Sequence, residues 1–460
     1  MLTHLRIKNF KAWQDTGPIR LAPLTVIFGS NSSGKSSLGH LLLALKQTVL
    51  STDRKRPLHL GDSNTLVDLG TFSDCLYNHD ESAQLEIEIG WKIAHGIDVV
   101  DPTTSNNSIS GDSLLLKVKF ESGRGSQPEV SFLQYVLSES EEPVLTVTFS
   151  KNNKGVWELV ADNYSFKMAL GRKWPLEAPE KFYRLSDVTL ARFQNASFLS
   201  DFALEMEFVL GEISYLGPLR SHPQRIYQWS GDTPTNVGQM GEATIAALLA
   251  ARDDQRYLNR GPKQGKRRFE EFIAAWLKDL GVIQDFQVRP VAEGRKEYEV
   301  LVKTHRSSPL VKITDVGFGV SQVLPALVQA FYAQPNSTVW MEQPEIHLHP
   351  QVQAELADAF VSAIQSRQDG KDRNVQLIIE SHSEHFLNRL QRRVAEEKAD
   401  PSDIAIYFAK RNLSKVNLEE LEMNEFGEIS NWPENFFGDE MADISGRTVA
   451  ALQRMKKRKA

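Results

Sequence analysis

One stretch near the start of the chain has the residues of a phosphate-binding loop. Residues 28–37 read Phe-Gly-Ser-Asn-Ser-Ser-Gly-Lys-Ser-Ser and fill every fixed position of G-x-x-x-x-G-K-[ST]. A loop that wraps a triphosphate turns its N–H groups inward, and Gly29 and Gly34 remove the steric barrier to this. We expect Lys35 to reach the β- and γ-phosphates and the Ser36 hydroxyl to bind Mg²⁺. The predicted nucleotide contacts are Gly29, Ser30, Asn31, Ser32, Ser33, Gly34, Lys35, Ser36 and Ser37.

The segments on both sides of this loop support the prediction. Residues 24–28 are a short apolar run typical of a buried strand, and residues 38–50 carry apolar side chains at a spacing of three to four, as in a helix. Strand, glycine loop and helix follow in the order that aims a helix N-terminus at the phosphates. Upstream, Phe10 or Trp13 either covers an adenine ring or belongs to the core.

Two later strands end in residues suited to the other half of such a site. The predicted strand 338–341 leads into Glu342, where a carboxylate at a strand end can hold Mg²⁺ and the attacking water. The predicted strand 375–379 leads into Glu380-Ser381-His382, and His382 is placed to contact the γ-phosphate or its nucleophile. Ser36 and Glu342 are the predicted metal ligands.

A second anion site is predicted before an apolar helix. Residues 315–322 read Asp-Val-Gly-Phe-Gly-Val-Ser-Gln. Because proline is tolerated in the first turn of a helix, Pro325 predicts a helix that begins close to Ser321. Gly319, Ser321 and Gln322 are therefore expected at its N-terminus as further nucleotide contacts.

Zinc is an alternative reading of the histidines in this region. The residues concerned are His347, His349, His382 and His385, together with Glu342 and Glu345. Their spacing does not place an i, i+4 histidine pair beside a glutamate base on a helix. A histidine pair satisfied within its own loop is the favoured interpretation of His347 and His349.

Composition predicts an ordinary globular protein of the cytoplasm. The 460 residues are 41% hydrophobic and carry a net charge of −6, so no nucleic-acid or membrane partner follows from the overall balance. The single cysteine, Cys75, excludes an internal disulfide framework and is expected to be a small buried residue. No run is apolar enough to span a bilayer, and the first residues lack a signal-peptide pattern.

The middle of the chain predicts an antiparallel sheet followed by helices. Alternating strands are expected at 85–89, 116–120, 144–148 and 156–160, with a hairpin turn at 152–155 and a flexible loop at 101–112. Residues 197–213 and two segments within 241–281 show helical periodicity. Between those two, residues 256–268 form the strongest basic cluster, which is either a solvated loop or a surface that contacts phosphates.

Taken together, these motifs resemble an ABC-type ATPase of the SMC/RecF/OLD group. Residues 342–350, Glu-Gln-Pro-Glu-Ile-His-Leu-His-Pro, resemble its Walker B and D-loop string D-E-P-E-[IL]-H-L-H-P, and residues 381–383 resemble its T-H-S switch. Residues 317–322 lie where its signature belongs but match loosely. The resemblance is strong for 2–50 and 312–393, and the long segment between them disfavours a transporter subunit.

The resemblance implies an α/β fold: a P-loop ATPase head with a mixed central sheet, an antiparallel β arm and an inserted helical and β region. The expected divisions are 1–170, 171–310, 311–430 and a tail at 431–460. ATP with Mg²⁺ is the implied cofactor. Two copies are expected to pair head to tail, each placing its Ser321 loop across the other's P-loop, as a dimer or higher homo-oligomer.

The implied catalytic residues are Glu342, Gln343, Glu345 and His382. Gln343 occupies the position of the usual catalytic glutamate. Hydrolysis is therefore expected to be slow, or to involve Glu345.

Stand-alone ATPases with this E-Q-P-E and E-S-H-S-E-H pair resemble subunits of bacterial anti-phage systems such as Septu, PARIS and retron-associated modules. We therefore expect a sensor and scaffold that controls a separate effector, a nuclease. A nuclease in cis is not expected, because the residues after His385 lack D-x-D. A DNA-binding repair ATPase of the RecF/SMC kind is the alternative, with nucleic acid as the partner.

Overall fold

The computed structural model describes residues 1–104, 108–171, 174–261, 264–317, 319–412 and 415–433, with residues 445, 447 and 450 in the tail. Most of the predicted tail 431–460 therefore lies outside the described residues, as do Phe318 and Lys263.

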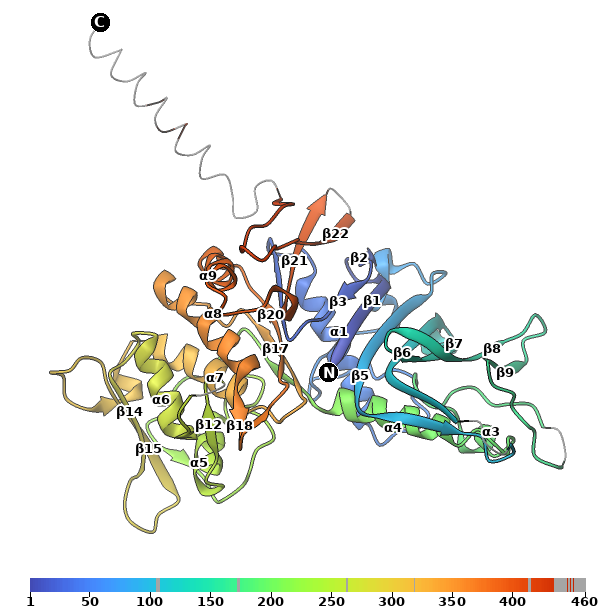
Figure 1. The fold of residues 1–460 in the computed structure, drawn as a ribbon, viewed down its shortest axis with the longest axis horizontal. Helices are drawn as coiled ribbons and strands as arrows, with labels where there is room; N and C mark the ends of the chain where they lie inside the picture. The colour runs from blue at the N-terminus through green and yellow to red at the C-terminus, as the bar shows by residue number, and fades with distance from the viewer. Residues whose placement is uncertain are drawn as a thin grey trace, which may run out of the picture.

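A six-stranded sheet forms the centre of the molecule (Figure 1). In spatial order its strands are β10 (Ile213–Leu216), β17 (Thr338–Glu342), β20 (Gln376–Glu380), β4 (Leu24–Gly29), β21 (Ile404–Asn412) and β22 (Lys415–Glu420). The first five run parallel, and β22 pairs antiparallel with β21. The predicted mixed central sheet is therefore confirmed.

Helices cover both faces of this sheet. In β4, Ile27 joins one core, while Leu24, Val26 and Phe28 join the other, as alternation along a strand requires. The first core contains α1 (Lys35–Leu50) and α4 (Phe198–Gly211). The second core contains α5 (Thr244–Asp253), α6 (Phe269–Asp279), α7 (Gly319–Tyr332), α8 (Pro350–Gln365) and α9 (Glu384–Ala395). Coverage on both faces explains why β4, β17 and β20 are buried along their whole length.

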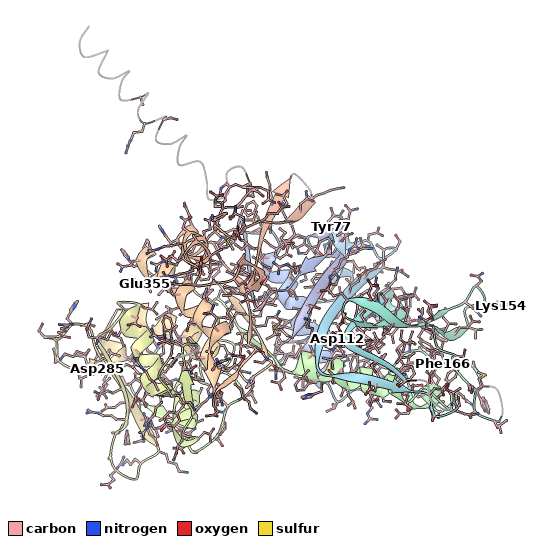
Figure 2. All side chains as sticks on the ribbon, in the orientation of Figure 1. Tyr77, Asp112, Lys154, Phe166, Asp285 and Glu355 are labelled. Carbon is pink, nitrogen blue, oxygen red and sulfur yellow. The ribbon has the colours of Figure 1, made fainter. Side chains whose placement is uncertain are left out.

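The predicted antiparallel arm is an eight-stranded sheet packed on the first core. Its strands are β1 (Leu2–Phe10), β2 (Trp13–Asp15), β3 (Ile19–Arg20), β5 (Leu85–Val100), β6 (Ser108–Ser122), β7 (Pro128–Glu139), β8 (Glu142–Lys151) and β9 (Trp157–Asp162). Lys154, in the predicted hairpin turn, lies at the outer tip of the arm (Figure 2). The expected loop 101–112 is too long, because Ser108 already pairs with Val100. Strand β7 was not predicted.

Two small sheets accompany α5 and α6 in the inserted region. One contains β11 (Tyr227–Gln228), β14 (Asp285–Pro290), β15 (Glu297–Lys303) and β16 (Val311–Lys312). The other contains β12 (Tyr257–Asn259), β13 (Arg267–Arg268), β18 (Arg367–Gln368) and β19 (Lys371–Asp372). Short helices α2 (Phe72–Cys75) and α3 (Asp187–Leu190) complete the fold with single 3₁₀ turns. The domain boundaries given above stay a prediction.

Two helices begin earlier than the sequence pattern indicated. Helix α1 starts at Lys35, directly after the glycine loop. Helix α7 starts at Gly319, which puts Pro325 in its second turn and makes the first-turn prediction wrong. A proline there removes one backbone hydrogen bond, at a cost of about 3 kcal/mol. Burial of α7 from Val320 onward offsets that cost.

Cys75 is buried as expected, and burial raises the pKa of its thiol to about 11. Among the described residues, no helix is long and apolar enough to cross a membrane.

A glycine in α1 couples this helix to the central sheet. A Cβ at Gly39 would lie 2.4 Å from the Trp340 indole, so Gly39→Ala should lower the free energy of unfolding by about 1–3 kcal/mol through overpacking. Gly211→Ala, at the end of α4, has open space and should leave stability unchanged or slightly higher. Urea unfolding of both variants measures the difference, and equal stabilities would contradict the packing argument.

Candidate nucleotide site

The predicted phosphate loop joins β4 to α1 with left-handed backbone at both glycines. Gly29 has φ 148° and Gly34 has φ 82°. A Cβ at Gly29 would lie 2.5 Å from the Ala409 carbonyl oxygen on the neighbouring strand β21. Both positions favour glycine for their backbone conformation, and Gly29 also for its close packing against β21.

Lys35 lies over this loop. Its Nζ donates hydrogen bonds to the carbonyls of Gly29 and Ser30, both at 2.9 Å. Burial lowers the pKa of Lys35, and Glu380, Glu345 and Glu342 act in the opposite direction. These three carboxylates come from the distant C-terminal half of the sequence, so the fold brings the two halves of the predicted site together.

Ser36 faces carboxylates at the ends of β17 and β20. Parallel register pairs Glu342 with Glu380, and the Ser36 hydroxyl donates to Glu380 Oε2 at 2.8 Å. Burial and the neighbouring charge of Glu342 raise the pKa of Glu380 to about 8. For Glu342 burial acts upward, but hydrogen bonds from His40 and Tyr215 outweigh it and lower the pKa.

Several residues of this cluster were not among the predicted site residues. The Tyr215 hydroxyl donates to Glu342 Oε1 at 2.8 Å, and His40 Nε2 lies 3.4 Å from the same oxygen. The Trp340 indole donates to Glu380 Oε1 at 3.1 Å. Of these residues, only Glu380 could have been recognised as a site residue from the sequence, because it ends a buried strand just as Glu342 does.

Glu345 holds the turn that carries His382. Its Oε1 accepts hydrogen bonds from the Ser381 hydroxyl at 2.8 Å and from the His382 N–H at 2.7 Å. Burial raises the pKa of Glu345. Burial and the nearby charge of Lys35 lower the pKa of His382 to about 4, so its imidazole is neutral at pH 7.

Gln343 and Arg220 lie beside the same turn. Gln343 has φ 44° and donates its N–H to the Glu380 carbonyl at 2.8 Å. Arg220 is 7% exposed, and its Nη2 donates to the Glu342 carbonyl at 3.4 Å. Burial lowers the pKa of Arg220 to about 10, and Nε and Nη1 have no hydrogen-bond partner among the described residues.

Gly319, Ser321 and Gln322 form a separate group at the start of α7. Ser321 and Gln322 are buried, and Ser321 lines a small cavity with Ser221 and Glu242. The loop 29–37 instead contacts the ends of β17 and β20. The structure thus divides the predicted nucleotide contacts into two groups.

The donor set beside the loop fits Mg²⁺. Ser36, Glu342 and Glu380 offer hydroxyl and carboxylate oxygens, which this hard cation prefers, and Mg²⁺ takes its remaining ligands from water and phosphate. In the described part of the chain, no three His, Cys, Asp or Glu side chains are grouped to hold a metal ion. A zinc site built from His347, His349 and their neighbours is therefore not supported.

The aromatic rings upstream belong to the core. Phe10 and Trp13 are both fully buried. The Trp13 indole donates to the Gly34 carbonyl at 3.0 Å and to the Ser37 hydroxyl at 2.9 Å. Trp13 therefore supports the phosphate loop through these hydrogen bonds. Because its ring is buried, it cannot stack on an adenine.

The basic cluster 256–268 separates into structural and exposed residues. Arg256 donates to the carbonyls of Phe331, Tyr332 and Ala333, at the C-terminal end of α7. Arg260 stacks on Trp276 at 3.8 Å. Of the cluster's other basic residues that the structure describes, Lys266, Arg267 and Arg268 are exposed.

A family model described as "AAA ATPase domain" matches residues 252–387. This match includes Glu342, Glu345, Glu380 and His382. Residues 252–387 are therefore similar to an ATPase domain. A second model, described as "Protein of unknown function (DUF3696)", matches residues 400–445.

Several solved structures of SMC heads are similar to this chain. One is titled "Crystal structure of the SmcHead bound to the C-winged helix domain of ScpA" (14% identity, 92% of this chain and 98% of that chain covered, TM-score 0.42). Another is the SMC head domain from Thermotoga maritima (10%, 92% and 99%, TM-score 0.39). A third is the Smc head with an extended coiled coil, bound to the C-terminal domain of ScpA derived from Pyrococcus furiosus (12%, 92% and 96%, TM-score 0.38). No curated protein matches the chain.

The structural role of Arg256 can be tested against an exposed neighbour. Arg256→Ala should lower the free energy of unfolding by about 1.5–3 kcal/mol, because the carbonyls at the end of α7 lose a charged donor. Arg267→Ala, with an exposed side chain, should leave the melting temperature unchanged. Thermal melts of both variants measure this. If Arg256→Ala were as stable as the wild type, the structural role would be wrong and a contact of Arg256 with phosphates would be the better interpretation.

The charge state of His382 gives a second test. The pKa of His382 is about 4 in the folded chain and 6.5 in the unfolded chain. Between these two pH values the unfolded chain binds a proton at His382 that the folded chain does not bind. Stability from this group is complete above pH 6.5 and falls as the pH drops toward 4. Histidine NMR should show a neutral His382 ring throughout pH 5.5–8, and a midpoint near 6.5 would refute the prediction.

Proposed function

We propose that this chain is an ABC-type ATPase that binds ATP with Mg²⁺ between two head-to-tail copies. In this proposal it is a cytoplasmic sensor and scaffold for a separate effector, a nuclease, in bacterial anti-phage defence. The observation that carries the enzymatic part is the convergence of Lys35 and Ser36 with Glu342, Glu380 and His382 at one edge of the central sheet. The defence role rests on the resemblance of the E-Q-P-E and E-S-H-S-E-H strings.

Different loop residues would bind different parts of the nucleotide. Backbone N–H groups of 29–34 and the N-terminus of α1 would hold the phosphates, and Lys35 would move from the loop carbonyls to the β- and γ-oxygens. Mg²⁺, when bound, neutralises charge that develops on the phosphates. Glu345 keeps the His382 turn in place, so the neutral His382 ring can accept or donate a hydrogen bond near the γ-phosphate.

Gln343 favours slow turnover. An amide cannot accept a proton from the attacking water as a carboxylate does. ATP then acts as a long-lived clasp between copies, and such a clasp suits a scaffold that must hold an effector until triggered.

The division of the predicted contacts into two groups supports pairing between copies. The group at Ser321 would contact nucleotide held by the phosphate loop of a second copy. Each composite site then needs Lys35 from one chain and Ser321 from the other.

Mixing two inactive variants tests this arrangement. Lys35→Ala and Ser321→Ala should each lose ATP turnover when alone. In a mixture, heterodimers contain one site with both residues intact, so turnover should return to a fraction of the wild-type rate. The control is the Lys35→Ala/Ser321→Ala double variant mixed with Lys35→Ala, which cannot form an intact site. Phosphate release and oligomer mass are read from the same samples, and a mixture as inactive as its parts would refute composite sites.

A DNA-binding ATPase of the RecF/SMC kind is the second candidate, and the exposed residues Lys266, Arg267 and Arg268 favour it. ATP-dependent DNA binding that weakens with salt, and that disappears when these three residues and Lys263 are neutralised, would support this candidate. Defence activity with nucleic-acid cleavage by this chain alone would instead exclude a separate effector.

A further inference from the structure

The register of the central sheet places two carboxylates at one point. Glu342 and Glu380 end neighbouring parallel strands as direct partners, and such strands lie about 4.8 Å apart. Both are at least 95% buried. Ser36, the predicted Mg²⁺ ligand of the phosphate loop, donates to Glu380 Oε2. Glu380 is therefore as close to the metal-binding hydroxyl as a ligand of the same ion would be.

Outer donors orient both carboxylates in the same way. Tyr215 and His40 contact Oε1 of Glu342, and Trp340 contacts Oε1 of Glu380. Carboxylates that bind metal ions are commonly fixed by such second hydrogen bonds, which leave the other oxygen for the ion. In Glu380 that other oxygen is the one that meets Ser36.

A divalent ion would also offset the crowding of acidic groups at this point. Glu342, Glu345 and Glu380 are the carboxylates of this cluster, and Lys35 and Arg220 are its charged cations. Glu345 Oε2 is buried without a hydrogen-bond partner among the described residues. Buried carboxylates without compensating charge are costly, so a divalent ion at Ser36 would stabilise the group.

We propose that Glu380 is a second carboxylate ligand of the Mg²⁺ site, acting with Ser36 and Glu342. This inference rests on the proposed ATPase function. The site then differs from one built on a single strand-end carboxylate, because β20 contributes a ligand as well as β17. Its two carboxylates should hold a divalent ion more tightly than Ser36 and Glu342 alone.

Binding of Mn²⁺, a paramagnetic substitute for Mg²⁺, tests the assignment directly. Electron paramagnetic resonance of the full chain with ADP measures free Mn²⁺, and so gives the metal affinity without turnover. Glu380→Gln keeps the size of the side chain and should weaken Mn²⁺ binding at least tenfold, as Glu342→Gln should. Glu419→Gln, on the exposed face of β22 in the same sheet, is the matched control and should bind like the wild type.

The outcomes separate this inference from the proposed function. Loss of Mn²⁺ affinity in Glu380→Gln, with ADP affinity in EDTA unchanged, supports the assignment. If Glu380→Gln binds Mn²⁺ as tightly as the wild type while Glu342→Gln loses affinity, the assignment of Glu380 as a ligand is wrong. The ATPase proposal is not affected by that result. Failure of the wild-type chain to bind ADP or ATP at all refutes the proposed function itself.

A second variant covers the case in which Glu380→Gln does not fold. Trp340→Phe removes the donor to Glu380 Oε1 and leaves the carboxylate in place. It should weaken Mn²⁺ binding several-fold through loss of orientation, and unchanged binding in a folded Trp340→Phe protein would count against Glu380 as a ligand.

Discussion

Parallel pairing of β4 with β20 and of β20 with β17 is the constraint on which the site depends. Because parallel strands end at the same edge, Gly29 meets Glu342 and Glu380 there, although it lies hundreds of residues before them in sequence. Loss of that register by one residue would turn the carboxylates toward the wrong face. Helices α1 and α4 on one face and α5 to α9 on the other keep these strands buried.

Burial at this edge gives the charged groups their properties. The same desolvation raises the pKa of Glu380, lowers that of Lys35 and keeps His382 neutral. In water Glu380 and Lys35 would be ordinary exposed charges at pH 7. Inside the molecule their pKa values move toward the neutral form of each group.

The glycines and aromatic rings around the loop show how packing serves binding. Gly29 lets β21 approach, Gly39 admits the Trp340 ring, and Trp13 braces Gly34. Trp340 in turn donates to Glu380. Core packing and the orientation of site residues are therefore the same set of contacts, so a substitution far from the phosphates can still alter the site.

The sequence alone determined the local parts of this protein. The loop 28–37 with its strand and helix, the buried strands that end at Glu342 and Glu380, and the alternation of the arm all follow from patterns of neighbouring residues. Tertiary structure alone decided which residues meet: Tyr215, His40 and Trp340 at the carboxylates, Arg256 at the end of α7, and Ser321 apart from the loop. The physical reason is that strand pairing and burial join distant segments. The spacing of residues along the chain does not show which strands pair or in which register. The same limit explains the misplaced start of α7, where burial of the whole helix outweighs the local preference of Pro325.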